Sequence, residues 1–374
     1  MPRNICHIVK AFGNKNQTYT KDLLELLNTT SNDNHFVFCH RLFVKTDRIT
    51  VFTIKQYNRI QFLLIHLKLY TFDSDYRDLS KVLPLSVLQK WIVLCINKPD
   101  ILHLHHMHAI PLPLLRYFKC NKVKVIMSLR GRDLLIDTQN ETQQILLKQK
   151  LSLADIVHNI SAYMSTYLKD QLHIESKVIY RGQELPKAKN IKTDFDKTDV
   201  IRLIAVGRLE WVKGHIYSIE SVHRLRQKGY NVTLDIYGDG SLKEYFNYRI
   251  NQLELQDSIS LKGHLDNKEL KEHYKNYDVA LQPSLSEALS NGLVDLMMHN
   301  LPCVITNVGG MPEVIVHQKS GVVISVNDMV ALDNAILEAN SMNFDELRLH
   351  NETHKKQFSR DVELKEFNKL YNAV

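Results

Sequence analysis

The regular alternation of short apolar runs with helical windows is the feature that most limits what this 374-residue chain can fold into. Strands that alternate with helices predict parallel sheets with helices on both faces. The chain is longer than a domain with a single hydrophobic core usually is, so we expect two such units. The expected strands lie at 4–9, 100–106, 122–129, 154–160, 176–181, 201–207, 232–238, 258–263, 278–284, 302–308 and 321–326.

Clear helical windows cover 216–228, 242–253 and 267–275, and residues 358–374 read as an amphipathic closing helix. The stretch 182–199 is charged, poor in apolar residues and carries a proline, which is typical of a linker. The predicted boundaries are therefore 1–185 for a first domain, 186–199 for a linker, 200–355 for a second domain and 356–374 for a helix that returns to the first domain. The expected fold class is α/β, with two doubly wound Rossmann-like domains facing across a cleft.

The N-terminal sequence, the cysteines and the charge distribution indicate the cellular location of the chain and the kind of partner that it binds. Residues 1–12 resemble a first strand and not a signal peptide, and the apolar run 82–96 is broken by Gln89 and Lys90. The five cysteines are dispersed, as in a reducing cytoplasm. Residues 1–199 hold 29 Lys and Arg against 18 Asp and Glu, a net +11 in a chain of net +7. The basic half predicts an anionic partner, such as a membrane surface, a phosphorylated lipid or a nucleic acid, although compositional drift explains it as simply.

Three strand ends carry residues suited to a diphosphate. Ligands of parallel α/β units bind at the carboxyl ends of the strands. Arg208 and Lys213 follow one strand, and the planar guanidinium of the arginine together with the ammonium of the lysine can hold two phosphates. Taken alone, these residues are more simply interpreted as part of a solvated loop. Two further strands run into glycines that let backbone approach a ribose or a flat ring. These glycines, with the one beside Arg208, are Gly207, Gly238, Gly240 and Gly263.

The stretch 281–314 places Glu287 and Asp295 around a helix start. Ser290 or Asn291 can cap that helix, so its free amides form an anion site. Carboxylates on either side can accept hydrogen bonds from sugar hydroxyls. The arrangement predicts a ligand with hydroxyls at both ends and phosphates in the middle, which describes a nucleotide sugar.

These motifs, in this order, resemble those of the retaining glycosyltransferases of family 4, which have the GT-B fold. The similarity rests on Gly207-Arg208-Leu209 with Lys213-Gly214, Tyr237–Gly240, Pro283-Ser284 with Glu287, Pro302–Thr306, and Gly309-Gly310 with Pro312-Glu313, over about 110 residues. Residues 7–27 and 103–135 more loosely resemble capsule and exopolysaccharide members of the family.

The resemblance implies a role for each matched position. Arg208 and Lys213 would bind the donor diphosphate, Glu287 the sugar hydroxyls and Asp295 the ribose, and Gly13 would let the N-terminal loop approach the donor. Contact with the acceptor or the donor sugar falls to Arg130, Asp133 and His105. The phosphate site is completed by the amides of Leu289, Ser290, Asn291, Gly292 and Leu293.

Two positions depart from the family pattern. Asp295 stands where the family has a glutamate, which shortens the side chain by about 1.5 Å. Arg130 stands where the family has a histidine, and an arginine there favours an anionic sugar or a phosphate.

The expected activity is retaining transfer of a sugar from a nucleotide-sugar donor to a glycan or polyprenyl-diphosphate-linked acceptor in cell-surface polysaccharide biosynthesis. The resemblance implies no metal and no other cofactor, and no nucleic-acid partner. It makes the first predicted domain the acceptor side and the second the nucleotide-sugar side. From the dispersed cysteines and the basic first half we expect a cytoplasmic chain that is peripheral at the inner face of the membrane. Two alternatives stay open: a GT-B nucleotide-sugar epimerase, and an inactive glycosyltransferase-like partner subunit.

Three further stretches admit a sharper and a plainer interpretation. His103–His108 could ligate a metal, but histidines of the core or of the site are favoured because no carboxylate stands at ligand spacing. Residues 72–75 contain an Asp-Ser-Asp that mimics a metal motif of glycosyltransferases of another fold. Residues 59–70 mix basic and apolar side chains and could touch a membrane, but a core element is the favoured prediction.

Overall fold

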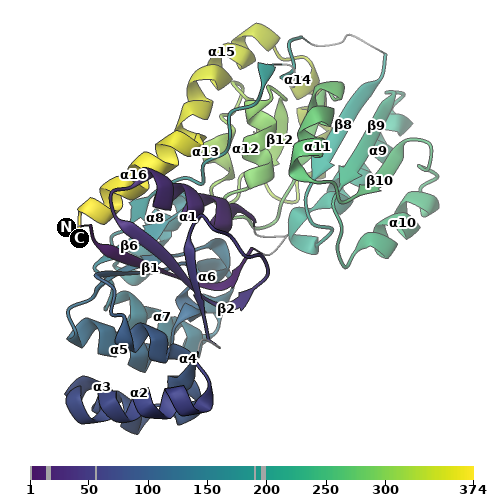
Figure 1. Cartoon of the computed structure of the whole chain (residues 1–374). Helices are drawn as coiled ribbons and strands as arrows, with labels where there is room; N and C mark the ends of the chain where they lie inside the picture. Colours follow the sequence, from purple (N-terminus) through teal and green to yellow (C-terminus); the bar gives the residue numbers. More distant parts are fainter. Residues whose placement is uncertain (1, 14–17, 55–56, 189–190, 195–198) are drawn as a thin grey trace. The chain divides into compact units, whose positions relative to one another are not determined.

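The chain forms two compact units in a computed structural model that describes residues 2–374 except 14–17, 55–56, 189–190 and 195–198. The first unit contains residues 1–160, 165–179 and 364–374, and the second contains 161–164 and 180–363. Figure 1 shows the elements of both. The boundaries drawn from the sequence stay a prediction, and part of the proposed linker lies outside the described residues.

The first unit is built on a parallel sheet with the strand order β3-β2-β1-β4-β5-β6-β7. Its strands are β1 (Asn4–Phe12), β2 (Asn34–Leu42), β3 (Thr50–Thr53), β4 (Ile101–Leu104), β5 (Lys124–Ser128), β6 (Ile156–Asn159) and β7 (Lys177–Val178). The chain returns to it at the end. Residues Phe367, Leu370 and Tyr371 of α16 (Arg360–Asn372) join Ile5 and Val9 of β1 in one core cluster.

Helices connect these strands. They are α1 (Thr18–Thr30), α2 (Arg59–Phe72), α3 (Ser74–Val82), α4 (Leu85–Ile96), α5 (Leu112–Cys120), α6 (Gly131–Leu135), α7 (Glu141–Leu151) and α8 (Ala162–Leu172). Strands β2 and β3 were not predicted from the sequence. His35, His40 and Arg41 interrupt the apolar pattern of β2, and β3 has only four residues.

The second unit repeats the same winding, with the strand order β10-β9-β8-β11-β12-β13. Its strands are β8 (Ile201–Val206), β9 (Val232–Tyr237), β10 (Ile259–Gly263), β11 (Val279–Gln282), β12 (Cys303–Thr306) and β13 (Gly321–Ile324). Its helices are α9 (His215–Gln227), α10 (Lys243–Gln252), α11 (Asn267–His273), α12 (Asn291–Met298), α13 (Met311–Val314), α14 (Met329–Asn340) and α15 (Phe344–His354).

Both strand orders are Rossmann-like, which confirms the predicted α/β class. Strand β11 is buried at every position, as the continuous apolar run predicted for a sheet covered on both faces. Strand order reverses between β1 and β4, and again between β8 and β11. Open α/β sheets bind ligands at the carboxyl ends of the strands at such a reversal.

The prediction of a core element at residues 59–70 is wrong for most of that stretch. Of the α2 residues, Phe62 is buried, whereas Ile60 and Leu64 are 72% and 67% exposed. The helix carries apolar residues on opposite faces, so the sequence pattern could not show how many of them pack inward. No helix among the described residues is long and apolar enough to cross a bilayer.

Candidate functional site

The strand reversal in the second unit brings together the two loops that carry Arg208, Lys213 and Glu287. Leu281 of β11 pairs with Ala205 of β8, so the loops that follow the two strands begin side by side. Lys213 ends a short 3-10 helix, Trp211–Lys213, and its Nζ forms an ion pair with Glu287 Oε2. Both side chains are less than one-fifth exposed. Two residues that are 74 positions apart in the chain therefore form one polar centre.

Arg208 lies in the same loop but is exposed. Glu287 is paired with Lys213, whereas no salt bridge joins Arg208 to a carboxylate among the described residues, so its guanidinium is available to a ligand. An exposed cation beside a neutral ion pair is suited to an anionic ligand.

Close backbone contacts fix these loops, and three glycines make the contacts possible. Gly214, Gly238 and Gly309 all have positive φ angles, of 67°, 145° and 54°. A Cβ atom on Gly214 would lie 1.9 Å from the carbonyl oxygen of Pro283, and one on Gly238 would lie 1.9 Å from that of Gly207. The loops after β8, β9 and β11 thus interlock through their backbones.

The double glycine at 309–310 makes similar close backbone contacts. A Cβ atom on Gly309 would lie 1.5 Å from the carbonyl oxygen of Glu287, and Gly310 N donates to Ala288 O at 2.9 Å. Glu313 accepts hydrogen bonds from Ala162 N at 2.7 Å and from Tyr180 Oη at 2.8 Å. The double glycine therefore supports the backbone that carries Glu287.

Helix α12 begins as the sequence predicted. Ser290 is its N-cap, and Ser290 Oγ accepts from Leu293 N at 3.3 Å and from Gln282 Nε2 at 2.6 Å. A Cβ atom placed on Gly292 would have no atom closer than 3.8 Å, so a ligand can approach the backbone there more closely than at Gly214, Gly238 or Gly309. The remaining amides of this first turn, at Leu289, Asn291 and Leu293, belong to the same segment.

Asp295 lies one turn into α12 and is buried, and its partner was not predicted. Lys271 Nζ of α11 lies 2.7 Å from Asp295 Oδ1. The side chain of Lys271 is 17% exposed and that of Asp295 4%. No local pattern indicates this pair, because the two positions lie 24 residues apart with strand β11 between them. The carboxylate that we assigned to ribose binding is thus already paired with the ammonium group of Lys271.

His215 is a second residue that sequence reasoning missed. It is buried at the start of α9, and a Cβ on Gly207 would lie 3.4 Å from His215 Nε2. Burial, followed by the charge of Lys213, lowers the pKa of His215 to about 4. A neutral imidazole therefore lies directly behind the loop that carries Arg208.

The other predicted glycines take different positions. A Cβ on Gly240 would lie 2.5 Å from Leu209 O, so this glycine also serves loop packing. Gly263 ends β10 with a φ of 73° and no heavy atom within 4 Å of a virtual Cβ. In the first unit, Gly13 follows β1 with a φ of 73°, and its virtual Cβ would lie 2.8 Å from Val44 Cβ.

The first unit holds Arg130, Asp133 and His105 near the carboxyl ends of β4 and β5. Asp133 is buried and accepts from Arg130 N at 2.9 Å, while the Arg130 guanidinium lies 5.9 Å from the ring centroid of Tyr19. Burial lowers the pKa of Arg130. His105 is 2% exposed and is part of a buried histidine cluster, so a contact with a ligand would require this cluster to open.

His7, His103 and His105 form a group of three side chains whose ring nitrogens could share a metal ion. These nitrogens already have partners. His7 Nδ1 lies 3.1 Å from His105 Nε2, and the two nitrogens of His103 contact Tyr371 Oη at 2.8 Å and Ser128 Oγ at 2.6 Å. Burial holds the pKa of all three well below 6.5, and the charge of Arg130 lowers those of His103 and His105 further. The same positive charge opposes a buried dication, so the cluster fits a neutral hydrogen-bonded network better than a metal site. The absence of a metal cofactor stays a prediction.

A family model described as "Glycosyl transferases group 1" matches residues 187–357, which include every element of the site in the second unit. Residues 187–357 are a group 1 glycosyltransferase domain. The match places the predicted motifs of the second half inside one known domain.

Two curated proteins illustrate what this glycosyltransferase domain is similar to. The uncharacterized glycosyltransferase MJ1607 of Methanocaldococcus jannaschii is 30% identical over 120 residues, which cover 32% of this chain and 30% of the relative. The amylovoran biosynthesis glycosyltransferase AmsK of Erwinia amylovora is 30% identical over 158 residues, covering 41% and 39%. The chain thus spans about a third of the length of these curated relatives.

The fold matches solved glycosyltransferase structures over the whole chain. The Anabaena protein HepE, crystallised in complex with UDP, superposes with a TM-score of 0.74 at 15% identity and covers 100% of both chains. This likeness confirms the GT-B class of the two Rossmann-like units.

Proposed function

We propose that the chain transfers a sugar, with retention, from a nucleotide-sugar donor to a glycan or lipid-linked acceptor in cell-surface polysaccharide biosynthesis. One observation carries the proposal: the Lys213–Glu287 ion pair and Arg208 meet at the strand reversal of a group 1 glycosyltransferase domain. The named role of AmsK in amylovoran biosynthesis supports the polysaccharide context.

The residues of the second unit suit departure of a nucleoside diphosphate. Negative charge grows on the leaving phosphate as the glycosidic bond breaks, and Arg208, Lys213 and the amides before α12 can stabilise it. Such preorganised donors contribute about 2.7–4 kcal/mol each in transition states that build up charge on oxygen. When the diphosphate engages Lys213, Glu287 becomes free to accept hydrogen bonds from the hydroxyls of the donor sugar.

Retention is proposed without a covalent intermediate. Asp295 is buried against Lys271, and Glu287 is proposed to hold the hydroxyls of the donor sugar, so neither of these two carboxylates is assigned the role of a nucleophile. Reaction on one face of the sugar, with the departing phosphate taking the proton of the incoming hydroxyl, needs only positioning and charge stabilisation from the protein.

We also propose that the acceptor carries an anionic lipid and that the chain works as a peripheral protein at the inner face of the membrane. The net +11 of residues 1–199 supports this, because basic surfaces concentrate near anionic lipid.

Nucleotide binding gives the first test. Thermal unfolding is measured with UDP, GDP and ADP, each at about 100 times its dissociation constant, where binding adds about 2.7 kcal/mol of stability. One nucleotide should raise the Tm of the wild type by roughly 5 °C and that of Arg208→Ala clearly less. If no nucleotide shifts the Tm, the donor assignment is wrong.

Transfer gives the second test. Lys213→Ala should keep its fold and lose roughly 100-fold or more in kcat/KM. Glu287→Gln should keep diphosphate binding but lose transfer. Incubating the matching nucleotide sugar without acceptor separates the main alternative, because an epimerase would isomerise the sugar and a transferase would leave it unchanged apart from slow hydrolysis.

A further inference from the structure

Helix α2 (Arg59–Phe72) is well defined at its start. Asn58 Oδ1 accepts from Gln61 N at 2.9 Å, and Gln61 Oε1 accepts from Asn58 N at 3.1 Å, which forms a reciprocal capping box. The inner face packs on the first unit. Phe62 is 4% exposed, and His66 Nδ1 contacts Tyr76 Oη of α3 at 2.9 Å. The orientation of α2 on this unit is therefore fixed.

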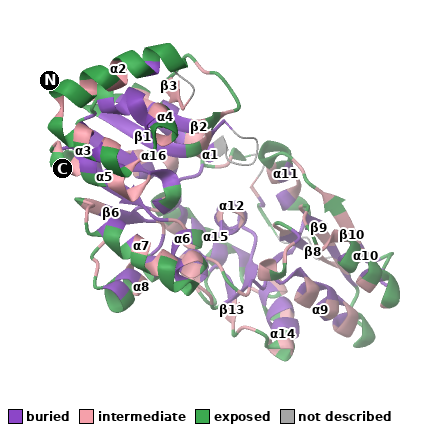
Figure 2. Ribbon diagram, turned by 90° about the horizontal axis from the view of Figure 1, so that it is seen from below, coloured by how far each residue is buried: buried purple, intermediate pink, exposed green. Residues whose placement is uncertain are grey.

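The opposite face of α2 is an exposed apolar stripe. We call Ile60, Leu63, Leu64 and Leu67 the α2 stripe; their side chains are 72%, 54%, 67% and 64% exposed. The spacing i, i+3, i+4, i+7 places these four on one side of a helix. Phe72, at the end of the helix, is 82% exposed. Figure 2 shows α2 drawn mostly as exposed.

Single exposed leucines are common on proteins, but a continuous stripe of this kind marks an interaction surface. The charges near the stripe select the partner. Helix α2 contains Arg59 and Lys68 and no Asp or Glu. In the next helix, Asp78 is paired with Lys81 at 2.8 Å, and Asp73 between the helices is paired with Lys98 at 2.7 Å. The surface therefore combines apolar side chains with net positive charge.

These features fit a lipid surface better than a second copy of the chain. Two stripes packed against each other around a twofold axis would bring Arg59 and Lys68 of both helices together without intervening carboxylates on α2. A bilayer with anionic headgroups meets both the apolar and the basic groups. The helix has 14 residues, a length of about 21 Å, which is too short to cross a hydrocarbon core of about 30 Å. It is suited to lie in the plane of the interface.

We propose that the α2 stripe docks the chain on the surface of a bilayer that contains anionic lipid, with Ile60, Leu63, Leu64 and Leu67 inserted between the headgroups and Arg59 and Lys68 among the phosphates. This inference rests on the proposed function, because a lipid-linked acceptor is the reason for the chain to bind a membrane. It assigns the contact to one face of one helix.

The test uses the full chain without donor or acceptor, so that docking and catalysis can fail separately. Sedimentation with vesicles of phosphatidylcholine alone is compared with sedimentation with vesicles that contain one-third phosphatidylglycerol. The wild type should partition at least about tenfold more strongly to the anionic vesicles, because each basic residue near such a surface contributes about fivefold.

The apolar part is tested by Leu63→Gln/Leu64→Gln/Leu67→Gln. Glutamine keeps helix propensity and approximate length, and the three side chains are exposed, so the fold should persist. Partitioning should fall at least about tenfold. Leu349→Gln is the matched control, because Leu349 on α15 is 73% exposed, and it should bind as the wild type does.

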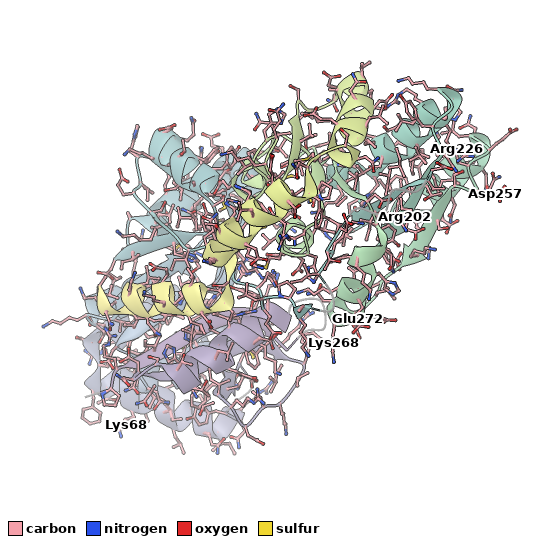
Figure 3. The ribbon with its side chains drawn as sticks, turned by 90° about the horizontal axis from the view of Figure 1, so that it is seen from above. Lys68, Arg202, Arg226, Asp257, Lys268 and Glu272 are labelled. Carbon is pink, nitrogen blue, oxygen red and sulfur yellow. The ribbon has the colours of Figure 1, made fainter. Side chains whose placement is uncertain are left out.

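The basic part is tested by Lys68→Gln against Lys268→Gln. Both lysines are exposed and are labelled in Figure 3, and Lys268 lies on α11. Loss of Lys68 should weaken binding to anionic vesicles roughly fivefold and leave binding to neutral vesicles unchanged. Loss of Lys268 should change neither.

Three outcomes would overturn the proposal. The first is wild-type binding by the triple glutamine variant with its melting curve intact. The second is a loss of binding in Leu349→Gln as large as in the triple variant. The third is a wild-type dimer in gel filtration that the triple variant dissociates, with vesicle binding by neither, which would assign the stripe to a second copy. Transfer to a water-soluble acceptor should survive in the triple variant, and its loss from wild type and variant alike would count against the proposed function alone.

Discussion

Gly309 lies directly against the backbone of Glu287, so that a methyl group on Gly309 would overlap the Glu287 carbonyl oxygen at 1.5 Å. The glycine follows β12 and the glutamate follows β11, and these neighbouring strands pair in register from Ala280 with Cys303 onward. The loop that presents Glu287 to Lys213 is therefore positioned from behind by a residue that contributes no side chain.

Gly309→Ala should damage both the stability and the activity of the second unit. The φ angle of 54° is unfavourable for alanine, and the overlap involves backbone on both sides, so the loop must move. The free energy of unfolding should fall by roughly 3 kcal/mol or more, and transfer should fall with it. Chemical denaturation and kcat/KM are the measurements.

Gly229→Ala is the control for the φ angle alone. Its φ is 89°, and no heavy atom lies within 4 Å of its virtual Cβ. We expect a loss of about 1 kcal/mol and unchanged transfer. If the two variants were equally stable, the contact with Glu287 would not be what requires a glycine at 309.

Arg208→Ala should weaken catalysis without a change in stability. Arg208 is exposed, so few packing contacts are lost with its side chain. We expect the loss of about 2–4 kcal/mol of transition-state stabilisation, measured as a reduction of kcat/KM, because Arg208 is the arginine of the loop 207–214 that follows β8. Arg116→Ala, which removes an exposed arginine of α5, should leave kcat/KM unchanged. If both substitutions reduced kcat/KM equally, the effect would come from the net charge of the protein and not from a specific contact of Arg208 with the donor.

The buried pair of Lys271 and Asp295 should contribute to stability only as a pair. Lys271→Met leaves a carboxylate that is 4% exposed without its cation, which should cost about 3–5 kcal/mol. Lys271→Met combined with Asp295→Asn should recover much of that loss. A denaturant-based double-mutant cycle measures the coupling, and additive effects would show that the ion pair has no role.

Acid should destabilise the first unit well above the pKa of its carboxylates. Burial lowers the pKa of His35 and of His158 to about 4, and holds those of His7, His103 and His105 well below 6.5. The unfolded chain therefore binds more protons than the folded chain below pH 6.5. Each such histidine removes up to about 1.4 kcal/mol of stability per pH unit as the pH falls from 6.5 toward its folded pKa.

The urea midpoint measured at pH 8, 7, 6 and 5 checks this expectation. It should be nearly constant from pH 8 to 7 and should fall steeply between pH 6.5 and 5. A midpoint that stays level down to pH 5 would mean that the histidine cluster opens to solvent or remains protonated in the folded chain.

The sequence predicted most of the fold because the strands β4, β5 and β8–β13 are short, rich in apolar residues and bounded by glycine, proline or charge. It also placed Ser290 at the start of α12, since an N-cap is a local signal. Contacts between distant positions had no such signal: the partner of Asp295 is Lys271, and neither residue type predicts the other. The apolar residues on both faces of α2 likewise gave no direction to its packing.

The hydrogen bond between His103 and Tyr371 has a consequence for biosynthesis. Strand β4 is synthesised long before α16. The first Rossmann unit therefore lacks the packing of Phe367, Leu370 and Tyr371 while the second unit is synthesised. The half that is translated first is thus the half that can finish folding last. Until α16 has been synthesised, the side chains of β1 and β4 that contact it lack these partners, so a truncation before Phe367 should destabilise the first unit more than the second.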